Sequence, residues 1–314
     1  MTKTVAVVGA GVIGLSTAIL ALEAGYSVTM YSDKSPLETT SMKAAASFKP
    51  HQVAYNDLTQ KMVETGWEYF ARIVAQYPQT SGVHKQIHWE TASVQKEQAP
   101  YLCAVEDFEI LERPHVPGGY AFGWRYQTFF IDTPVFLPWL VQRFTAGGGS
   151  LMLLEKGFTE LEQLAGLPSD VVFNCTGLGA KELCHDEAMT PVKGQIVIVD
   201  PQPQMDWSIS ADGFYIYPRK YDTVLGGTVE WQINHETVET GAVDLILRGN
   251  QRILPHLNRD LVKRTFAGLR PYRAGTIRLE SQNVNGKQII HNYGHGGSGY
   301  TLCWGSAHLA LELV

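Results

Sequence analysis

The order of apolar and polar positions predicts strands and helices that alternate at first, with a strand-rich stretch later. Apolar, mostly β-branched residues predict a buried strand at 5–8, an Ala- and Leu-rich run predicts a helix at 15–24 that ends at Gly25, and a second strand follows at 27–31. Helical spacing or helix start signals predict further helices at 57–77, 133–146, 237–254 and 304–313. Short apolar runs predict further strands at 118–130, 151–154, 171–175, 194–199, 213–218 and 224–228.

Three glycines separate the first strand from the first helix, at the spacing G-x-G-x-x-G. Gly9 suits a tight turn, Gly11 lets a pyrophosphate approach the backbone, and Gly14 lets the helix pack closely on the strand. The amino end of the helix then faces the diphosphate. Asp33 follows the second strand, where an acid would bind a ribose hydroxyl. Strand, turn, helix and acid together predict a dinucleotide site in an α/β fold.

The composition is typical of a globular protein. The chain has 314 residues, of which 45% are hydrophobic and 18% charged, and its net charge of −6 gives no reason to expect nucleic acid or an anionic membrane as a partner. No apolar run reaches the roughly 18 residues of a membrane helix, and the apolar N-terminus is interpreted as a strand rather than a signal peptide. The four cysteines show no C-x-x-C spacing, so a reduced, cytoplasmic protein is expected.

The predicted elements fall into two sets that interrupt each other along the chain. Residues 1–78, 131–192 and 276–314 carry the nucleotide-binding pattern and are expected to form one discontinuous domain. Residues 79–130 and 193–275 are expected to form a separate, inserted antiparallel sheet that binds the substrate.

A second glycine-rich turn lies near the other end of the chain. An apolar pair at 289–290 enters a turn that contains Gly294, Gly296, Gly297 and Gly299, and an apolar segment leaves it. Two such turns in one chain suit a ligand longer than NAD, and FAD fits. The first turn would bind the pyrophosphate. The second would bring a helix amino end to the flavin pyrimidine ring, where it stabilises the anionic reduced flavin.

These segments resemble those of FAD-dependent D-amino-acid oxidases, within the wider group that includes glycine and sarcosine oxidases. The resemblance covers nearly the whole chain and is most specific at the second glycine turn. It rests on the N-terminal glycine fingerprint and on residues 39–50, 129–140, 174–177, 268–273 and 291–301. It implies a Rossmann-type FAD-binding domain with the inserted sheet as substrate domain, non-covalent FAD, and a D-amino acid and O2 as substrates.

The resemblance also implies which residues form the site. Arg270 would bind the substrate carboxylate with two hydrogen bonds, Tyr215 would add a hydroxyl, and the Gly297 carbonyl would accept the substrate amine. A guanidinium fork suits a carboxylate, although a salt bridge for the arginine and a structural role for the tyrosine are the alternatives. The residues expected to bind FAD are Gly9, Gly11, Val12, Ile13, Gly14, Ser32, Asp33, Lys34, Thr39, Thr40, Ser41, Ala45, Ala46, Ser47, Thr176, Gly177, Gly296, Gly297, Ser298, Gly299, Tyr300 and Thr301.

The reaction that the resemblance implies needs little from side chains. Hydride would leave the α-carbon for flavin N5, the imine would hydrolyse in water, and O2 would be reduced to H2O2. No general base is therefore expected, and His291 and His295 are assigned to the structure of the second turn.

Two positions depart from the family pattern. Ala211 stands where eukaryotic members have a lid tyrosine, so the lid is expected to be missing and the pocket more open. Lys49 stands beside the expected flavin position, where it either adds a cation to the site or points to solvent.

Several alternatives stay open at this stage. The substrate could be another amine, such as glycine, an N-alkyl amino acid or a biosynthetic intermediate, and the enzyme could be a dehydrogenase. A non-catalytic flavin- or nucleotide-binding protein is a further hypothesis, and a nicotinamide enzyme leaves the second turn without a role. No metal is expected, although His84, His88 and Glu90 are considered as ligands; a homodimer is considered as well.

Overall fold

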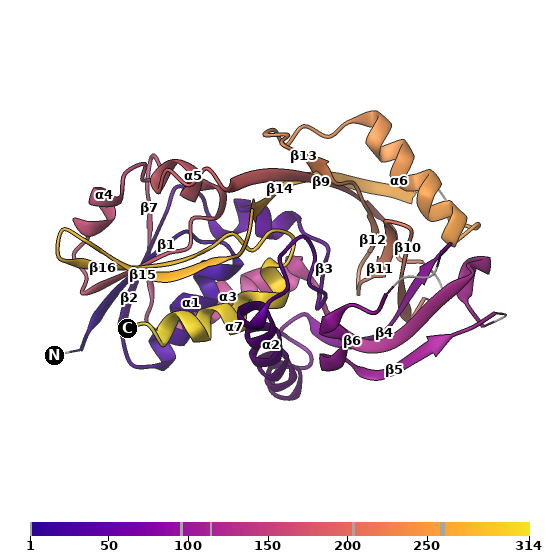
Figure 1. Ribbon diagram of the computed structural model, residues 1–314, viewed down its shortest axis with the longest axis horizontal. Helices are drawn as coiled ribbons and strands as arrows, with labels where there is room; N and C mark the ends of the chain where they lie inside the picture. The colour runs from indigo at the N-terminus through magenta and orange to yellow at the C-terminus, as the bar shows by residue number, and fades with distance from the viewer. Residues whose placement is uncertain (1, 95–96, 114, 203–204, 258–260) are drawn as a thin grey trace.

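The computed structural model describes residues 2–94, 97–113, 115–202, 205–257 and 261–314. The segments 79–130 and 193–275, expected to form the substrate domain, therefore contain some positions that lie outside the described residues. Two β-sheets lie beside each other, and helices α1, α2, α3 and α7 gather in the lower middle of the view (Figure 1). The described helices are α1 (Val12–Glu23), α2 (Asp57–Gln76), α3 (Thr133–Ala146), α4 (Leu161–Ala165), α5 (Ala180–Leu183), α6 (Thr240–Ile253) and α7 (Gly299–Leu311).

The first sheet has six strands and carries the nucleotide-binding topology. Five neighbouring strands are parallel, and β15 is antiparallel to β16. Their order is β15 (Arg278–Val284), β16 (Lys287–Tyr293), β8 (Val171–Asn174), β1 (Thr4–Val8), β2 (Ser27–Ser32) and β7 (Ser150–Leu153). Strands far apart in sequence meet here, since β1 lies between β2 and β8.

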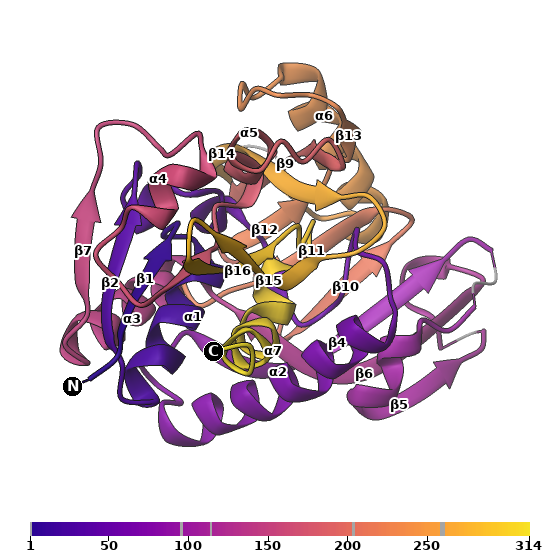
Figure 2. The ribbon, with the colours of Figure 1, turned by 60° about the vertical axis from the view of Figure 1, so that its left-hand side comes forward.

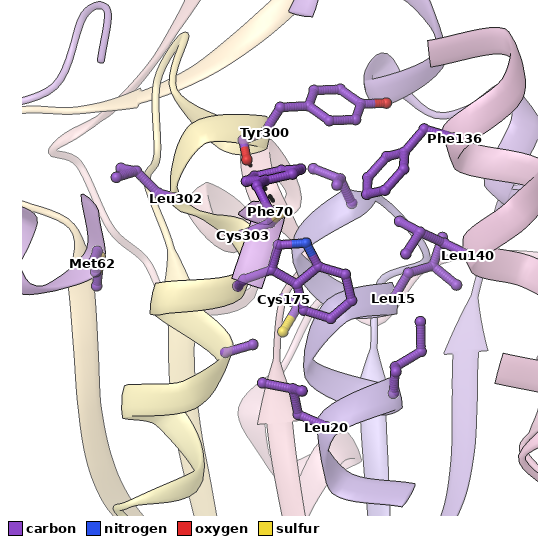
Figure 3. Close-up of a cluster of buried hydrophobic side chains, with 14 of the residues drawn as sticks. Leu15, Leu20, Met62, Phe70, Phe136, Leu140, Cys175, Tyr300, Leu302 and Cys303 are labelled. Atoms are coloured by element: carbon purple, nitrogen blue, oxygen red, sulfur yellow. Dashed lines mark hydrogen bonds between the residues drawn. The ribbon is translucent and has the colours of Figure 1, made fainter. Parts of the chain in front are cut away.

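The six-stranded sheet is buried on both faces. Val5 and Val7 of β1 pack into the core that contains α1, α2, α3 and α7, whereas Ala6 and Val8 pack into a second cluster with α4. This alternation explains why the strand is apolar throughout, because successive side chains enter opposite faces and both are covered. Figure 3 shows the larger core, where Leu15 and Tyr300 lie in the same cluster as Phe136.

Helix α1 begins one turn earlier than the sequence predicts. It starts at Val12, so Gly14 lies within its first turn, and it ends before Gly25, which has a positive φ of 87°. A Cβ at Gly14 would lie 1.9 Å from the Gly9 carbonyl oxygen, which explains why only glycine lets helix and strand approach this closely.

The second sheet has ten strands. Along its main path the order is β13 (Glu230–Trp231), β9 (Met189–Val199), β12 (Thr223–Gly226), β11 (Phe214–Pro218), β10 (Trp207–Ala211), β4 (Val83–Ala92), β6 (Phe122–Ile131) and β3 (Ala46–Ser47). The two further strands are β14 (Val262–Arg273), which pairs with β9, and β5 (Glu106–Leu111), which pairs with β6.

Three details of this sheet differ from the sequence-based expectation. Strands β10 and β4 are parallel, whereas the expected sheet was antiparallel; no hairpin joins these strands, so their direction is free. The sequence predicts that residues 46–47 belong to the nucleotide-binding domain, but they form β3 and pair with β6 in the larger sheet. The expected boundary between 192 and 193 falls inside β9.

One face of the ten-stranded sheet is covered by α6. Ile246 and Ile253 of this helix pack with Val197, Ile216 and Leu225. Helix α6 lies across the outer side of β9, β11 and β12 (Figure 2). On the opposite face of these strands, Ile196, Ile198, Tyr217 and Val224 pack with Phe130 in a separate cluster.

The end of β14 joins the two sheets. Tyr272 forms an isolated bridge with His295, and the Gly296 N–H donates to the Pro271 carbonyl over 2.9 Å. Strand β14 therefore fixes the segment after β16 next to residue 270. No helix within the described part of the chain has the length and apolar character needed to span a bilayer.

Candidate active site

The amino ends of α1 and α7 meet on one short segment of chain. The Val12 N–H donates to Ser41 Oγ over 3.0 Å, and the Tyr300 hydroxyl donates to the Ser41 carbonyl over 2.8 Å. A Cβ at Gly299 would lie 3.6 Å from Val12. The two glycine turns predicted at opposite ends of the chain therefore lie together in the fold.

The same segment is fixed further along by the second turn. Ser298 Oγ accepts from the His51 N–H over 2.7 Å and donates to the His51 carbonyl over 2.8 Å. Thr301 Oγ1 accepts from the Lys49 N–H over 3.1 Å and donates to the Ser47 carbonyl over 3.2 Å. The hydroxyls of Ser298 and Thr301 are thus hydrogen-bonded to the backbone of residues 47–51, which leaves the backbone groups of the turn to bind a ligand.

Arg270 lies flat over a glycine of the neighbouring strand. A Cβ at Gly194 would lie 2.2 Å from Arg270 Nη2, so any side chain there would displace the guanidinium. Arg270 Nη1 donates to the carbonyls of Lys193 (3.3 Å) and Thr228 (3.2 Å). Nε and Nη2 have no hydrogen-bond partner among the described residues, which leaves one edge of the guanidinium for a ligand. Burial lowers the pKa of Arg270, and Tyr215 and Glu230 act in the opposite direction.

Tyr215 occupies the same face of the sheet over another glycine. It is opposite Gly226 in the register, and a Cβ at Gly226 would lie 1.8 Å from the Tyr215 ring. Its ring stacks on that of Tyr217, with centroids 4.5 Å apart, as the shared face predicts. Burial raises the pKa of Tyr215, so its hydroxyl stays protonated at neutral pH and can donate.

Lys49 is paired inside the protein. Its ammonium lies 2.9 Å from Glu90 Oε1, and the two side chains are 20% and 16% exposed. Lys49 therefore does not point to solvent, and its place as an added cation beside the flavin stays a prediction. Burial alone would raise the pKa of Glu90, but Lys49 and the hydrogen bonds from Lys49 and Trp124 outweigh it and lower this pKa to about 2.

Donors surround the Glu90 carboxylate. Glu90 Oε2 accepts from the Tyr101 hydroxyl (3.3 Å), Trp124 Nε1 (3.2 Å) and the Tyr126 hydroxyl (3.2 Å). Together with Lys49 they make four donors, which matches the acceptor capacity of a carboxylate.

The two other residues considered as metal ligands have different surroundings. Both ring nitrogens of His88 are hydrogen-bonded, to Ser208 (2.9 Å) and Ser210 (3.0 Å), and burial lowers its pKa to about 3. His84 stacks on Phe130. Among the positions that the structure describes, no group of three or more His, Cys, Asp and Glu side chains could hold a metal.

His51 and Gln52 lie beside Gly297, and sequence reasoning did not nominate them. A Cβ at Gly297 would lie 2.8 Å from the His51 ring and 3.3 Å from Gln52 Oε1. Burial, with Arg270 and Lys49 nearby, lowers the pKa of His51 to about 4, so the imidazole is neutral. Both amide atoms of Gln52 are buried without a hydrogen-bond partner in the described structure. The only sequence signal was their position directly after Lys49 and Pro50.

A buried polar network lies behind Arg270. Lys193 is fully buried and pairs with Glu239 at 2.6 Å and Glu230 at 3.7 Å. Glu230 Oε1 also accepts from Gln195 Nε2 (2.8 Å) and Thr228 Oγ1 (2.5 Å). Because the Lys193 and Thr228 carbonyls hold Arg270, this network fixes the strand segments that orient the guanidinium.

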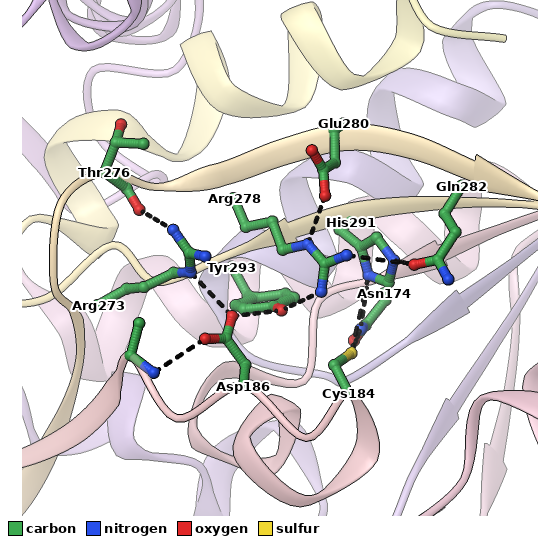
Figure 4. A network of polar contacts seen from close by, with 11 residues as sticks. Asn174, Cys184, Asp186, Arg273, Thr276, Arg278, Glu280, Gln282, His291 and Tyr293 are labelled. Atoms are coloured by element: carbon green, nitrogen blue, oxygen red, sulfur yellow. Dashed lines mark hydrogen bonds and ion pairs between the residues drawn. The ribbon is translucent and has the colours of Figure 1, made fainter.

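His291 belongs to a second network, at the edge of the six-stranded sheet (Figure 4). Its ring nitrogens contact Asn174 (3.1 Å) and Gln282 (2.9 Å). Nearby, the Asp186 carboxylate accepts from Arg273 Nε and from the Tyr293 hydroxyl, both at 2.8 Å.

His295 is buried, and its Nε2 lies 2.7 Å from Ser306 Oγ. The side chains of both histidines are engaged in the fold, as expected for residues of a structural turn.

The other predicted cofactor residues lie along the carboxyl edge of the six-stranded sheet. Asp33 and Lys34 are exposed after β2, whereas Ser32 is buried and accepts from the Lys34 N–H. The hydroxyls of Thr39 and Thr176 donate within their own turns, so their side chains are already used. Cys175 is a buried core residue whose pKa burial raises to about 12. Gly177 follows Thr176 with a positive φ of 58°, and the remaining predicted positions lie in the two glycine turns and in residues 40–47.

The arrangement fits FAD at three points. A Cβ at Gly9 or Gly14 would clash with the backbone of Cys175 or Gly9, so the first turn has the tight form that a dinucleotide site requires. The helix caps Gly11 and Ser298 make no side-chain capping hydrogen bond. Apart from the Val12 N–H, which donates to Ser41, the N–H groups that begin α1 and α7 are therefore suited to an anionic ligand. The orphaned Gln52 amide lies next to the second turn. Fold and site together define a flavin-binding α/β protein of the Rossmann type.

Comparison with known proteins agrees with this class. Residues 4–313 match the family described as FAD dependent oxidoreductase. The chain is 35% identical to a D-amino-acid oxidase of Rubrobacter xylanophilus, covering 98% of this chain and 94% of that protein, and 34% identical to human D-aspartate oxidase, covering 100% and 95%. The fold resembles that of glycine oxidase from Bacillus cereus with a TM-score of 0.81, at 21% identity over 99% and 95% of the two chains. The chain therefore belongs to the FAD-dependent oxidoreductase family that contains the D-amino-acid oxidases.

Membership confirms the fold class, the FAD cofactor and the enzymatic nature that the sequence predicts. The assignment of individual site residues stays a prediction, which the placements above make specific.

Proposed function

We propose that this protein catalyses the oxidative deamination of D-amino acids with O2 as the electron acceptor. The observation that carries the proposal is the guanidinium of Arg270, with one edge free, on the sheet face that also carries Tyr215. A planar fork beside a hydroxyl suits a carboxylate. The names of the relatives, D-amino-acid oxidase and D-aspartate oxidase, support the substrate class.

In this proposal the protein binds and orients the substrate. Arg270 and Tyr215 hold the carboxylate, and the exposed backbone of Gly297 meets the amine. Bound FAD supplies a two-electron acceptor for the hydride of the α-carbon and passes the electrons to O2, giving H2O2. The neutral amine becomes an iminium, and water hydrolyses it to the oxo acid and ammonia. No side chain has to remove the α-hydrogen as a proton.

The structure also bears on access to the site. Ala211 ends β10, and the two residues Asp212 and Gly213, both with positive φ, connect it directly to β11. This is a tight hairpin turn, and a pocket without a lid stays a prediction. The cytoplasmic location and a homodimer stay predictions.

The test is the visible spectrum of the purified holoenzyme under anaerobic conditions with D-alanine and a panel of other D-amino acids. We expect bleaching of the flavin by D-isomers, no bleaching by the L-isomers, and H2O2 once air is admitted. Glycine and sarcosine are included because an enzyme for another amine would be reduced by them alone. Absence of reduction by every D-isomer would remove the proposal.

A further inference from the structure

Lys49 and Arg270 belong to the same face of the ten-stranded sheet. Registers between neighbouring strands put Tyr215 opposite Ser210, and Ser210 opposite Glu90. Partners in register share a face, so Glu90, which holds Lys49, continues the row that starts near Arg270. Tyr217 lies on the same face, and its hydroxyl is 3.4 Å from Ser210 Oγ.

His51 is within electrostatic range of both cations. Its ring lies against Gly297, and both Arg270 and Lys49 contribute to its low pKa. Tyr217 stacks on Tyr215 and is also within electrostatic range of Lys49. The two cations thus act on the same imidazole, and the stacked Tyr215 and Tyr217 belong to the part of the sheet face between Arg270 and Glu90.

Lys49 has donors to spare, whereas Glu90 has no free acceptor site. The carboxylate receives four hydrogen bonds, from Lys49, Tyr101, Trp124 and Tyr126. The ammonium has three N–H groups, and the described structure gives the side chain of Lys49 one partner, Glu90. A group that is 80% buried and only partly hydrogen-bonded favours an acceptor in the neighbouring space.

We infer that Lys49 selects the substrate side chain, favouring D-amino acids whose side chain ends in a carboxylate or carboxamide oxygen over apolar side chains of the same size. The inference rests on the proposed function, with Arg270 holding the α-carboxylate. An oxygen at the end of the side chain completes the hydrogen bonds of the ammonium. An apolar end displaces water from it and offers no acceptor in return, which costs binding free energy.

The experiment compares substrates of matched shape on the holoenzyme. One set is D-aspartate, D-asparagine and D-leucine, and the other is D-glutamate, D-glutamine and D-homoleucine. The readouts are the rate and the half-saturation of anaerobic flavin bleaching. In at least one set we expect the ratio of reduction rate to half-saturation to be about ten- to a hundredfold higher for the oxygen-bearing members than for the apolar one, the size of one hydrogen bond to a charged group. The acid and amide members show whether the charge is needed.

The variant Lys49→Met with Glu90→Gln removes both charges and leaves no unpaired carboxylate. We expect this double variant to reduce its flavin equally well with oxygen-bearing and apolar substrates. If the ion pair were purely structural, its loss would slow flavin reduction by all substrates alike. Lys85→Met with Glu106→Gln is the matched control, because this pair, 2.6 Å apart, involves the opposite face of β4. This control variant should keep the preference for oxygen-bearing over apolar substrates that the unaltered enzyme has.

Two results would overturn the inference: equal reduction by the apolar member in both sets, or a ratio that persists in the Lys49 and Glu90 double variant. Failure of the proposed function looks different, because then no D-amino acid reduces the flavin, D-alanine included.

Discussion

At the scale of single residues, glycines decide how close the functional side chains lie to the sheet. Gly194 and Gly226 leave the room that Arg270 and Tyr215 occupy, and neither glycine has a positive φ. Their role is therefore close approach rather than backbone freedom. The arginine and tyrosine could be predicted from sequence, but these two glycines could not, since cross-strand register reveals them.

Arg270→Ala should raise the KM for D-amino acids and lower kcat/KM by about a hundredfold or more, because the carboxylate would lose its charged partner. Steady-state H2O2 formation measures this. Arg264→Ala, on the same strand but exposed and 3.7 Å from Asp222, is the control and should leave kcat/KM unchanged. Equal constants for Arg270→Ala and the unaltered enzyme would remove Arg270 from the site.

Gly194→Ala should impair substrate binding while leaving stability nearly intact. The new methyl would meet the flexible end of Arg270 rather than backbone, so the guanidinium moves and the fold does not. We expect a raised KM with unchanged FAD content and thermal midpoint. Gly241→Ala, which has open space around it, is the control. A normal KM in Gly194→Ala would show that Arg270 can act from a shifted position.

At the scale of elements, local patterns predicted the βαβ beginning, helix α2 and the approach of the two glycine turns. They could not predict that β4 and β10 pair in parallel, because these strands are distant in sequence and their pairing depends on the whole sheet. They also missed the Lys49–Glu90 pair, since β3 and β4 are brought together by β6, with which each of them pairs.

Helices α2 and α7 pack unusually closely, which gives a test at this scale. A Cβ at Gly305 would lie 2.0 Å from the Met62 carbonyl oxygen, so Gly305→Ala must push two helix backbones apart. We expect a loss of roughly 1–3 kcal/mol in the free energy of unfolding, measured by denaturant titration. Gly241→Ala again provides the comparison and should be neutral. An unchanged midpoint for Gly305→Ala would contradict the packing described.

At the scale of the whole molecule, buried neutral histidines link stability to pH. Burial lowers the pKa of His88 and His295 to about 3 in the folded protein, from 6.5 in the unfolded chain. Below pH 6.5 the unfolded chain therefore binds more protons than the folded one. The stability these groups contribute is complete above that pH and is lost as pH falls toward about 3.

We expect the thermal midpoint to fall between pH 7.5 and pH 5.5, before the carboxylates titrate. His295→Gln should reduce the size of this fall, whatever its effect on the midpoint at pH 7.5. His256→Gln, at an exposed position, should leave the fall as it is. A fall of the same size in His295→Gln would assign the effect to other groups.

The shared sheet face also limits how this chain can change in length. Adding or removing a single residue within β11 would turn both tyrosines toward α6, because side chains alternate along a strand. The connection at Asp212 and Gly213 has no such restriction, since neither residue belongs to the sheet face that carries Tyr215, Ser210 and Glu90. Length variation in descendants of this chain should therefore collect in the turns, while the strands between Arg270 and Glu90 keep their residue count.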